Sequence, residues 1–129
     1  ANTTYKLIVK SQKDKMLILR LLKELGINDV GVYVIASETA KLPDDIVDVL
    51  RKTTKSQIYV MLDTDNTGLT SAIEYEKNYD FIALFMTKGY SAKDPTDLVR
   101  ITDYNFVKKK FANMYLNEIV NDKERRVVS

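Results

Sequence analysis

Four short, largely apolar runs divide the chain at regular intervals. They cover residues 5–9, 31–36, 58–62 and 81–85. Continuous runs of this length are typical of strands in a parallel sheet whose two faces are both covered by helices. The pattern therefore predicts four buried strands.

Amphipathic segments lie between and after these runs. Residues 13–25 predict a first helix, which ends at Gly26, a residue that commonly follows a helix. Pro43 marks the start of a second helix, and apolar residues at helical spacing after Gly68 predict a third. Asp103 can cap a last helix. The alternation of strand and helix predicts an α/β chain with a four-stranded parallel sheet and helices on both faces.

Polar residues follow each predicted strand. Right-handed crossovers bring the carboxyl ends of parallel strands to one edge of the sheet, where open α/β sheets bind their ligands. The segments expected to meet at that edge are residues 10–11, 37–38, 63–65 and 86–94. Their convergence favours a binding site over a set of unrelated turns.

Two aspartates one residue apart end the third run. Alternate strand residues point to the same side, so Asp63 and Asp65 are expected to project together. Carboxylates this close repel unless a cation lies between them or one is protonated. Because Mg²⁺ prefers oxygen ligands and joins carboxylates to substrate phosphates, the pair predicts a Mg²⁺ or Mn²⁺ site. The alternative is cap chemistry, in which Asp65 or Asn66 caps the next helix.

The composition excludes several kinds of site. The 129 residues fit one domain, expected over residues 1–120 with a polar tail over 121–129. There is no cysteine and no histidine, which excludes disulfides and Ser-His or Cys-His triads within the chain. Neither a membrane span nor a signal peptide is recognised, so a soluble, cytoplasmic protein is expected. With a net charge of +2, any binding of nucleic acid must be local.

Three elements of the sequence carry a family resemblance. The first is an apolar strand with a polar turn and Asp14, and the second is a strand followed by Asp63-x-Asp65-x-x-Gly68. The third is the Lys-Asp-Pro-Thr-Asp-Leu-Val segment at residues 93–99. In this order and spacing they resemble the Toprim domain shared by bacterial-type DNA primases, topoisomerases, RecR-like repair proteins and OLD-family nucleases. The third element most resembles primases, and the first is similar to a variant found in primases of phage and mobile-element type.

The resemblance implies a Rossmann-like Toprim fold and metal-dependent nucleotidyl transfer for RNA primer synthesis in DNA replication. The implied metal ligands are Asp63, Asp65 and Asp94, and the implied nucleotide- or phosphate-binding residues are Lys13, Asn66 and Lys93. Asp94 has an alternative role as the cap of a short helix that begins at Pro95. The implied partners are nucleotides, a single-stranded DNA template, an RNA primer and a replicative helicase.

The first motif departs from the family pattern. The family carries Glu four residues before its Asp, followed by Gly, and these positions are Lys10 and Ser11 here. Glu38, at the end of the neighbouring strand, can supply the missing carboxylate. Alternatively, Lys10 stabilises phosphate charge in the transition state. A third interpretation is that the domain has lost catalysis and serves as a docking module of a replication protein.

Other functions remain open. A nuclease or topoisomerase activity belongs to the same family. Asp63-x-Asp65-x-Thr67 also matches the first motif of haloacid-dehalogenase-type phosphatases, although that motif normally follows the first strand. The lysines at 108–110 can contact a phosphate backbone, but such runs are more often a solvated helix face. Tyr90 and Tyr104 can stack on bases, although their spacing does not require it.

Overall fold

The computed structural model of the chain describes residues 2–35 and 42–120, which form a Rossmann-like α/β fold. Its four strands are all parallel and stand in the order β2-β1-β3-β4. The strands are β1 (Thr3–Val9), β2 (Val30–Val34), β3 (Thr54–Met61) and β4 (Ile82–Ala83). Glu38 and the predicted tail at residues 121–129 lie outside the described residues.

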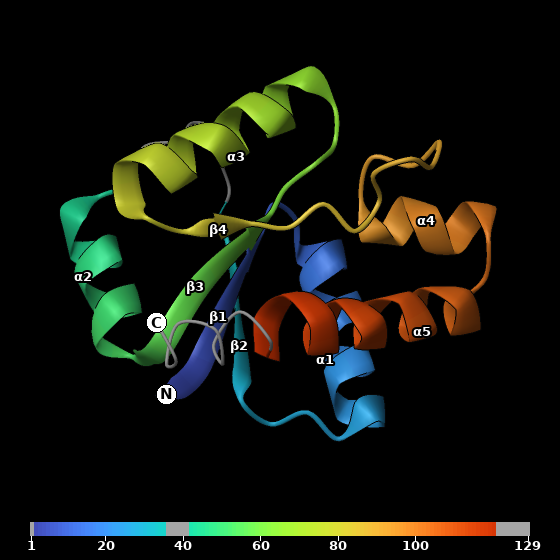
Figure 1. The fold of residues 1–129 in the computed structure, drawn as a ribbon, viewed down its shortest axis with the longest axis horizontal. Helices are drawn as coiled ribbons and strands as arrows, with labels where there is room; N and C mark the ends of the chain where they lie inside the picture. The colour runs from blue at the N-terminus through green and yellow to red at the C-terminus, as the bar shows by residue number, and fades with distance from the viewer. Residues whose placement is uncertain (1, 36–41, 121–129) are drawn as a thin grey trace.

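The helices cover both faces of the sheet, as the sequence predicted (Figure 1). They are α1 (Gln12–Leu25), α2 (Asp44–Lys52), α3 (Asn66–Tyr79), α4 (Pro95–Ile101) and α5 (Tyr104–Met114), which continues into a π-helical turn, η1 (Tyr115–Val120). The helices α1, α4 and α5 pack on one face, while α2 and α3 pack on the other. Within residues 2–35 and 42–120, no helix is both long and apolar enough to cross a membrane.

The two central strands, β1 and β3, are buried on both sides. Leu7 and Tyr59 point toward α1, α4 and α5, whereas Ile8 and Val60 point toward α2 and α3. This alternation explains why the sequence shows continuous apolar runs instead of an apolar–polar alternation, because each face of each strand meets a helix. Burial of both faces fixes the register, since a slip by one residue would exchange the two sets of side chains.

The bounds of all four strands differ from the sequence prediction, and the difference is largest for β4 and β3. Only Ile82 and Ala83 form β4, although the apolar run spans residues 81–85. The strand is at the edge of the sheet, and after Leu84 donates its N–H to the Val60 carbonyl the chain turns away toward α4. Strand β3 begins at Thr54 because that residue pairs with Thr3 of β1 before the apolar run begins.

The direction of the connections reverses between β1 and β3. The β1–β2 connection passes through α1 on one face, while α2 and α3 carry the next two connections on the opposite face. The strands β1 and β3 are neighbours with Val9 paired to Met61, so their carboxyl ends lie side by side. Such a reversal opens a crevice at the strand ends, which is the usual ligand site of open α/β sheets.

Gly68 lets the first turn of α3 pack directly against the chain that leaves β3. A Cβ atom at this position would lie 1.9 Å from the backbone carbonyl oxygen of Asp63. No side chain fits that distance without movement of the backbone. The glycine therefore permits the close approach of α3 to the Asp63 backbone, at the point where the chain leaves β3.

We predict that Gly68→Ala lowers the free energy of unfolding by about 1–3 kcal/mol, the usual cost of overpacking. The sign is diagnostic, because Gly→Ala in an unconstrained helix is stabilising. Urea unfolding of the variant measures the change. Thr67→Ala, at an exposed position in the same turn, is the control and should shift stability by less than about 0.5 kcal/mol. An unchanged or more stable Gly68→Ala protein would contradict the close approach.

Candidate functional site

Three carboxylates meet at the carboxyl edge of the sheet. They belong to Asp14 of α1, Asp63 after β3, and Asp94 at the start of α4, and one oxygen of each lies within 4.8 Å of the others. Asp14 and Asp63 are 2% and 4% exposed, and Asp94 is partly buried. Clustered carboxylate oxygens are the donors that Mg²⁺, Mn²⁺ and Ca²⁺ prefer, so this trio of aspartates can hold a divalent ion.

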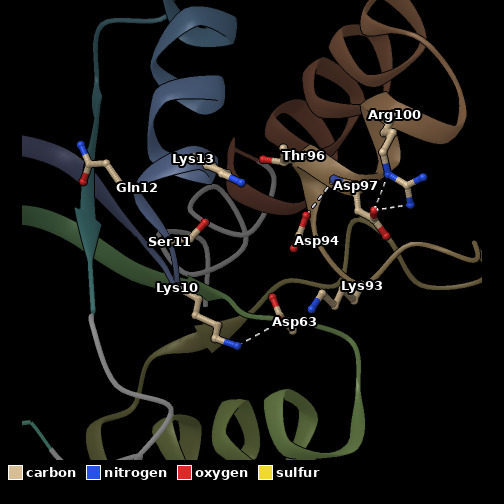
Figure 2. A pocket seen from close by; sticks show the side chains of 10 residues that line it. All are labelled: Lys10, Ser11, Gln12, Lys13, Asp63, Lys93, Asp94, Thr96, Asp97 and Arg100. Carbon is tan, nitrogen blue, oxygen red and sulfur yellow. Dashed lines mark hydrogen bonds and ion pairs between the residues drawn. The ribbon is translucent and has the colours of Figure 1, made fainter.

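Asp63 sits at the reversal point between β1 and β3. It lies two residues after Met61, the last residue of β3, and its side chain points toward Asp94 (Figure 2). The ammonium nitrogen of Lys10, the first residue after β1, lies 3.0 Å from Asp63 Oδ2. Lys10 is 32% exposed and therefore reaches the buried carboxylate from the solvent side. The ion pair joins the ends of the two central strands.

Asp14 connects the N-termini of α1 and α4. Its Oδ2 accepts a hydrogen bond from Ser11 Oγ at 3.0 Å, and its own N–H donates to that hydroxyl, which caps α1. Its Oδ1 accepts from the Thr96 hydroxyl at 2.7 Å and the Thr96 N–H at 3.2 Å. An ionised carboxylate has about four lone-pair positions, so these three bonds leave room for one more partner.

Asp94 combines the two roles that the sequence left open. Its side chain caps α4 by accepting from the Asp97 N–H at 2.8 Å, and it also belongs to the trio. Burial raises the pKa of the Asp94 carboxyl, the negative charges of Asp14 and Asp97 raise it further, and the capping hydrogen bond opposes them. The charged form of Asp94 is therefore less favourable than that of a free aspartate, and a nearby cation would offset this cost.

The structure does not place Asp65 in this trio. Asp65 is exposed and caps α3, accepting from the Gly68 N–H at 2.8 Å. Because β3 ends at Met61, strand alternation no longer requires the Asp63 and Asp65 side chains to project together. A metal-binding role for Asp65 stays a prediction. Cap chemistry, the alternative stated for Asp65, is what the structure shows, and Asp14 completes the acidic trio instead.

A cleft of about 570 Å³ opens beside the trio (Figure 2). Its lining residues are Lys10, Ser11, Gln12, Lys13, Asp63, Lys93, Asp94, Thr96, Asp97 and Arg100. Four of these ten side chains are basic and three are acidic, and Lys10 and Arg100 are paired with Asp63 and Asp97. Lys13 and Lys93 are therefore the cations that can contact an anionic ligand next to the acidic trio. The Arg100 guanidinium is fixed by two hydrogen bonds to Asp97 Oδ1, at 2.7 and 3.0 Å.

The predicted phosphate-binding residues fall in different places. Lys13 and Lys93 line the cleft, and the Lys93 carbonyl accepts from the Thr64 N–H at 2.9 Å, which ties its loop to the end of β3. Asn66 is exposed at the first position of α3 and does not line the cleft. Glu38 lies outside the described residues, so its proposed catalytic role stays a prediction.

Asp14 is the site residue that sequence reasoning did not assign to the metal. It lies 49 positions before Asp63. The pairing of β1 with β3 brings it near Asp63, and the packing of α1 against α4 brings it near Asp94. Its place in the first of the three Toprim-like elements was the available signal. The Ser11–Asp14 spacing indicated only a helix cap.

Comparison of the chain with models of protein families, with curated proteins and with solved structures gave no match. The fold and the geometry of the edge are therefore the observations on which a function rests. They are a Rossmann-like parallel sheet, a reversal point between its central strands, and a trio of aspartates beside a basic cleft.

We predict that Asp94→Asn raises the melting temperature at pH 7, because asparagine keeps the helix cap and removes a partly buried charge. The pKa of the Asp94 carboxyl is higher in the folded state than its unfolded value of about 3.9. Protonation of this carboxyl therefore stabilises the folded state at a pH below the unfolded pKa, and this stabilisation is lost as the pH rises through the folded pKa. The difference between variant and wild type should therefore shrink as the pH falls toward 3. Thermal unfolding across pH 3–8 without metal measures it.

Asp103→Asn is the matched control for this series, because Asp103 caps α5 in the same way from an exposed position. It should show no comparable gain at pH 7. A wild-type protein that is more stable than Asp94→Asn at pH 7 in the absence of metal would contradict the assigned electrostatic cost.

Proposed function

We propose that this chain is a Toprim-like domain of a DNA primase-like protein that transfers nucleotides in a metal-dependent reaction. One observation carries the proposal. Each of the three sequence elements that resemble the family contributes one carboxylate, Asp14, Asp63 or Asp94, to the same trio. Helix caps alone would not require these three elements to meet at the reversal point of the sheet.

The trio fits Mg²⁺ or Mn²⁺. Asp63 and Asp94 would hold the ion, with the remaining lone pair of Asp14 as a third donor. When bound, such an ion neutralises triphosphate charge and activates the attacking hydroxyl. Lys13 and Lys93 line the adjoining cleft, where their ammonium groups can contact phosphate oxygens.

Lys10 replaces the acidic residue of the family pattern, and its position supports a charge-stabilising role. Its ammonium group is 3.0 Å from Asp63 and also borders the basic cleft. A fixed cation there would stabilise the charge that develops on a transferring phosphate. In two-metal sites the second metal ion has this role. In this proposal the site uses one divalent ion together with Lys10.

The partners in this proposal are nucleotides, a single-stranded DNA template, an RNA primer and a replicative helicase, and the protein would work in the cytoplasm. A haloacid-dehalogenase-type reaction has less support. It needs Asp63 as an accessible nucleophile and Asp65 as the acid/base group. Asp63 is 4% exposed and Asp65 caps α3.

A non-catalytic docking module is the second candidate, and the Lys10–Asp63 ion pair favours it. The pair neutralises Asp63 without any metal. A domain that kept only its fold would need such an internal counter-charge, because a buried carboxylate without a partner is costly. The two candidates differ in whether divalent ions bind.

We predict that Mn²⁺ and Mg²⁺ raise the melting temperature of the wild type and not of Asp63→Asn. Binding to the folded state adds about 2.7 kcal/mol of stability when the free ion is at 100 times its dissociation constant. Asp65→Asn is the matched control, since it changes the neighbouring acid, keeps a capping residue and should retain the metal response. The metal centre is refuted if the wild type shows no response, or if the Asp63 and Asp65 variants respond alike.

We predict that Lys10→Gln tightens Mn²⁺ binding and weakens primer synthesis on a single-stranded template. Removal of a cation at 3.0 Å from Asp63 leaves that carboxylate free to bind the ion, while the stabilisation of phosphate charge is lost. Calorimetry measures the first effect and incorporation of labelled ribonucleotide the second. Lys77→Gln, on the exposed side of α3, should leave both unchanged. Weaker Mn²⁺ binding by Lys10→Gln would show that Lys10 does not compete with the ion.

A further inference from the structure

An exposed pair of aromatic rings lies beside the loop that carries the candidate site. Tyr90, in the loop between β4 and α4, is 40% exposed, and Phe106, on α5, is 39% exposed. Their ring centroids are 5.8 Å apart with an edge-to-face angle of 72°. Each ring is therefore partly accessible to solvent. Burying both rings in the core would have stabilised the fold, so their exposure is notable.

A lysine stands next to these rings. The ammonium nitrogen of Lys110, one turn after Phe106 on α5, lies 4.9 Å from the centroid of the Tyr90 ring. Lys108 of the same run is engaged differently, because it pairs with Glu24 of α1 at 3.2 Å. In the described part of the chain, no carboxylate pairs with Lys110. The half-buried Lys110 ammonium group therefore has an aromatic ring as its neighbour.

A groove continues from Lys110 along α5. It has a volume of about 350 Å³, and its lining residues are Phe85, Met86, Lys110, Asn113, Met114, Asn117 and Glu118. Phe106, Lys110, Asn113 and Asn117 recur at helical spacing and so lie on one face of the helical segment. We call Tyr90 and these four residues the aromatic strip.

The loop between β4 and α4 connects the strip to the candidate site along the chain. Tyr90 lies three residues before Lys93, a distance of at most about 10 Å along the chain. Lys93 and Asp94 line the cleft beside the acidic trio, and the hydrogen bond from Thr64 N–H to the Lys93 carbonyl fixes the end of the loop there. A strand bound along the strip could therefore extend past Tyr90 toward the acidic trio.

We propose that the aromatic strip binds single-stranded nucleic acid. Exposed rings offer faces on which successive bases stack, Lys110 offers a positive charge to the backbone, and the Asn113 and Asn117 amides can hydrogen-bond base edges. The Lys110 ammonium group beside two exposed rings favours this partner over an apolar protein helix, because lysine, amide and carboxylate side chains interrupt the apolar surface of the groove. This inference rests on the proposed function, for which it supplies the path of the template or primer strand.

Fluorescence anisotropy of a dye-labelled 20-nucleotide single-stranded DNA, with EDTA present, tests the strip without involving the metal. The wild type should bind it more tightly than the corresponding duplex, whose bases are already stacked. Tyr90→Ala/Phe106→Ala should weaken binding at least tenfold, because each lost stacking contact is worth about fivefold or more. Tyr90→Phe, which keeps the ring, should bind like the wild type.

Lys110→Gln should lower the slope of log affinity against log salt by about 0.7, the value for one phosphate contact on a single strand. Lys77→Gln, on the opposite face of the sheet, is the charge-matched control and should leave the slope unchanged. Phe106→Leu keeps an apolar residue at that position, so weaker binding by this variant would reflect the ring and not misfolding.

Undiminished DNA binding by Tyr90→Ala/Phe106→Ala, or no binding by the wild type at low salt, would overturn the inference. These outcomes are separate from failure of the proposed function. If single-stranded DNA binds through the rings but no variant or wild type responds to Mn²⁺, the strip stands and the metal-dependent reaction falls. If Mn²⁺ binds at Asp63 and the rings contribute nothing to DNA binding, only the strip is wrong.

Discussion

The parallel pairing of β1 with β3 is the constraint on which the rest of the site depends. Because Val9 is paired with Met61, the two strands end together, and the residues that follow them, Lys10 and Asp63, must lie side by side. The connections from these ends leave on opposite faces of the sheet and create the crevice. Helices α1 and α4 then place Asp14 and Asp94 against Asp63 from one face.

The negative charges of the three aspartates at this edge are only partly compensated by nearby donors and cations. Within residues 2–35 and 42–120, Asp63 has Lys10 as a partner and Asp14 has three hydrogen-bond donors. In the same part of the chain Asp94 has one backbone donor, and burial raises its pKa. Three carboxylates within 4.8 Å repel one another, and one ammonium group on the rim offsets only part of that repulsion. Structures that hold such groups together at a cost to stability are typically functional sites.

Much of the fold followed from the sequence because it depends on local pattern. Apolar runs, Gly26 and the acidic caps predicted the alternation of strand and helix, and the right-handed crossover rule predicted that the strand ends would converge. The choice between Asp65 and Asp14 depended instead on tertiary geometry. It required the end of β3 at Met61 and the packing of α1 against α4, neither of which the spacing of residues determines. The aromatic strip likewise joins Tyr90 to α5 and η1 through contacts between residues distant in the chain.

Paramagnetic broadening by Mn²⁺ tests the central claim most directly, because it reports which aspartates approach the ion. In carbon-detected NMR spectra, substoichiometric Mn²⁺ should broaden the side-chain carboxyl signals of Asp14, Asp63 and Asp94 together, and leave those of Asp44 and Asp48 on α2 sharp. Broadening that is absent, or equally strong at the α2 aspartates, would contradict a divalent-ion site at the reversal point of the sheet.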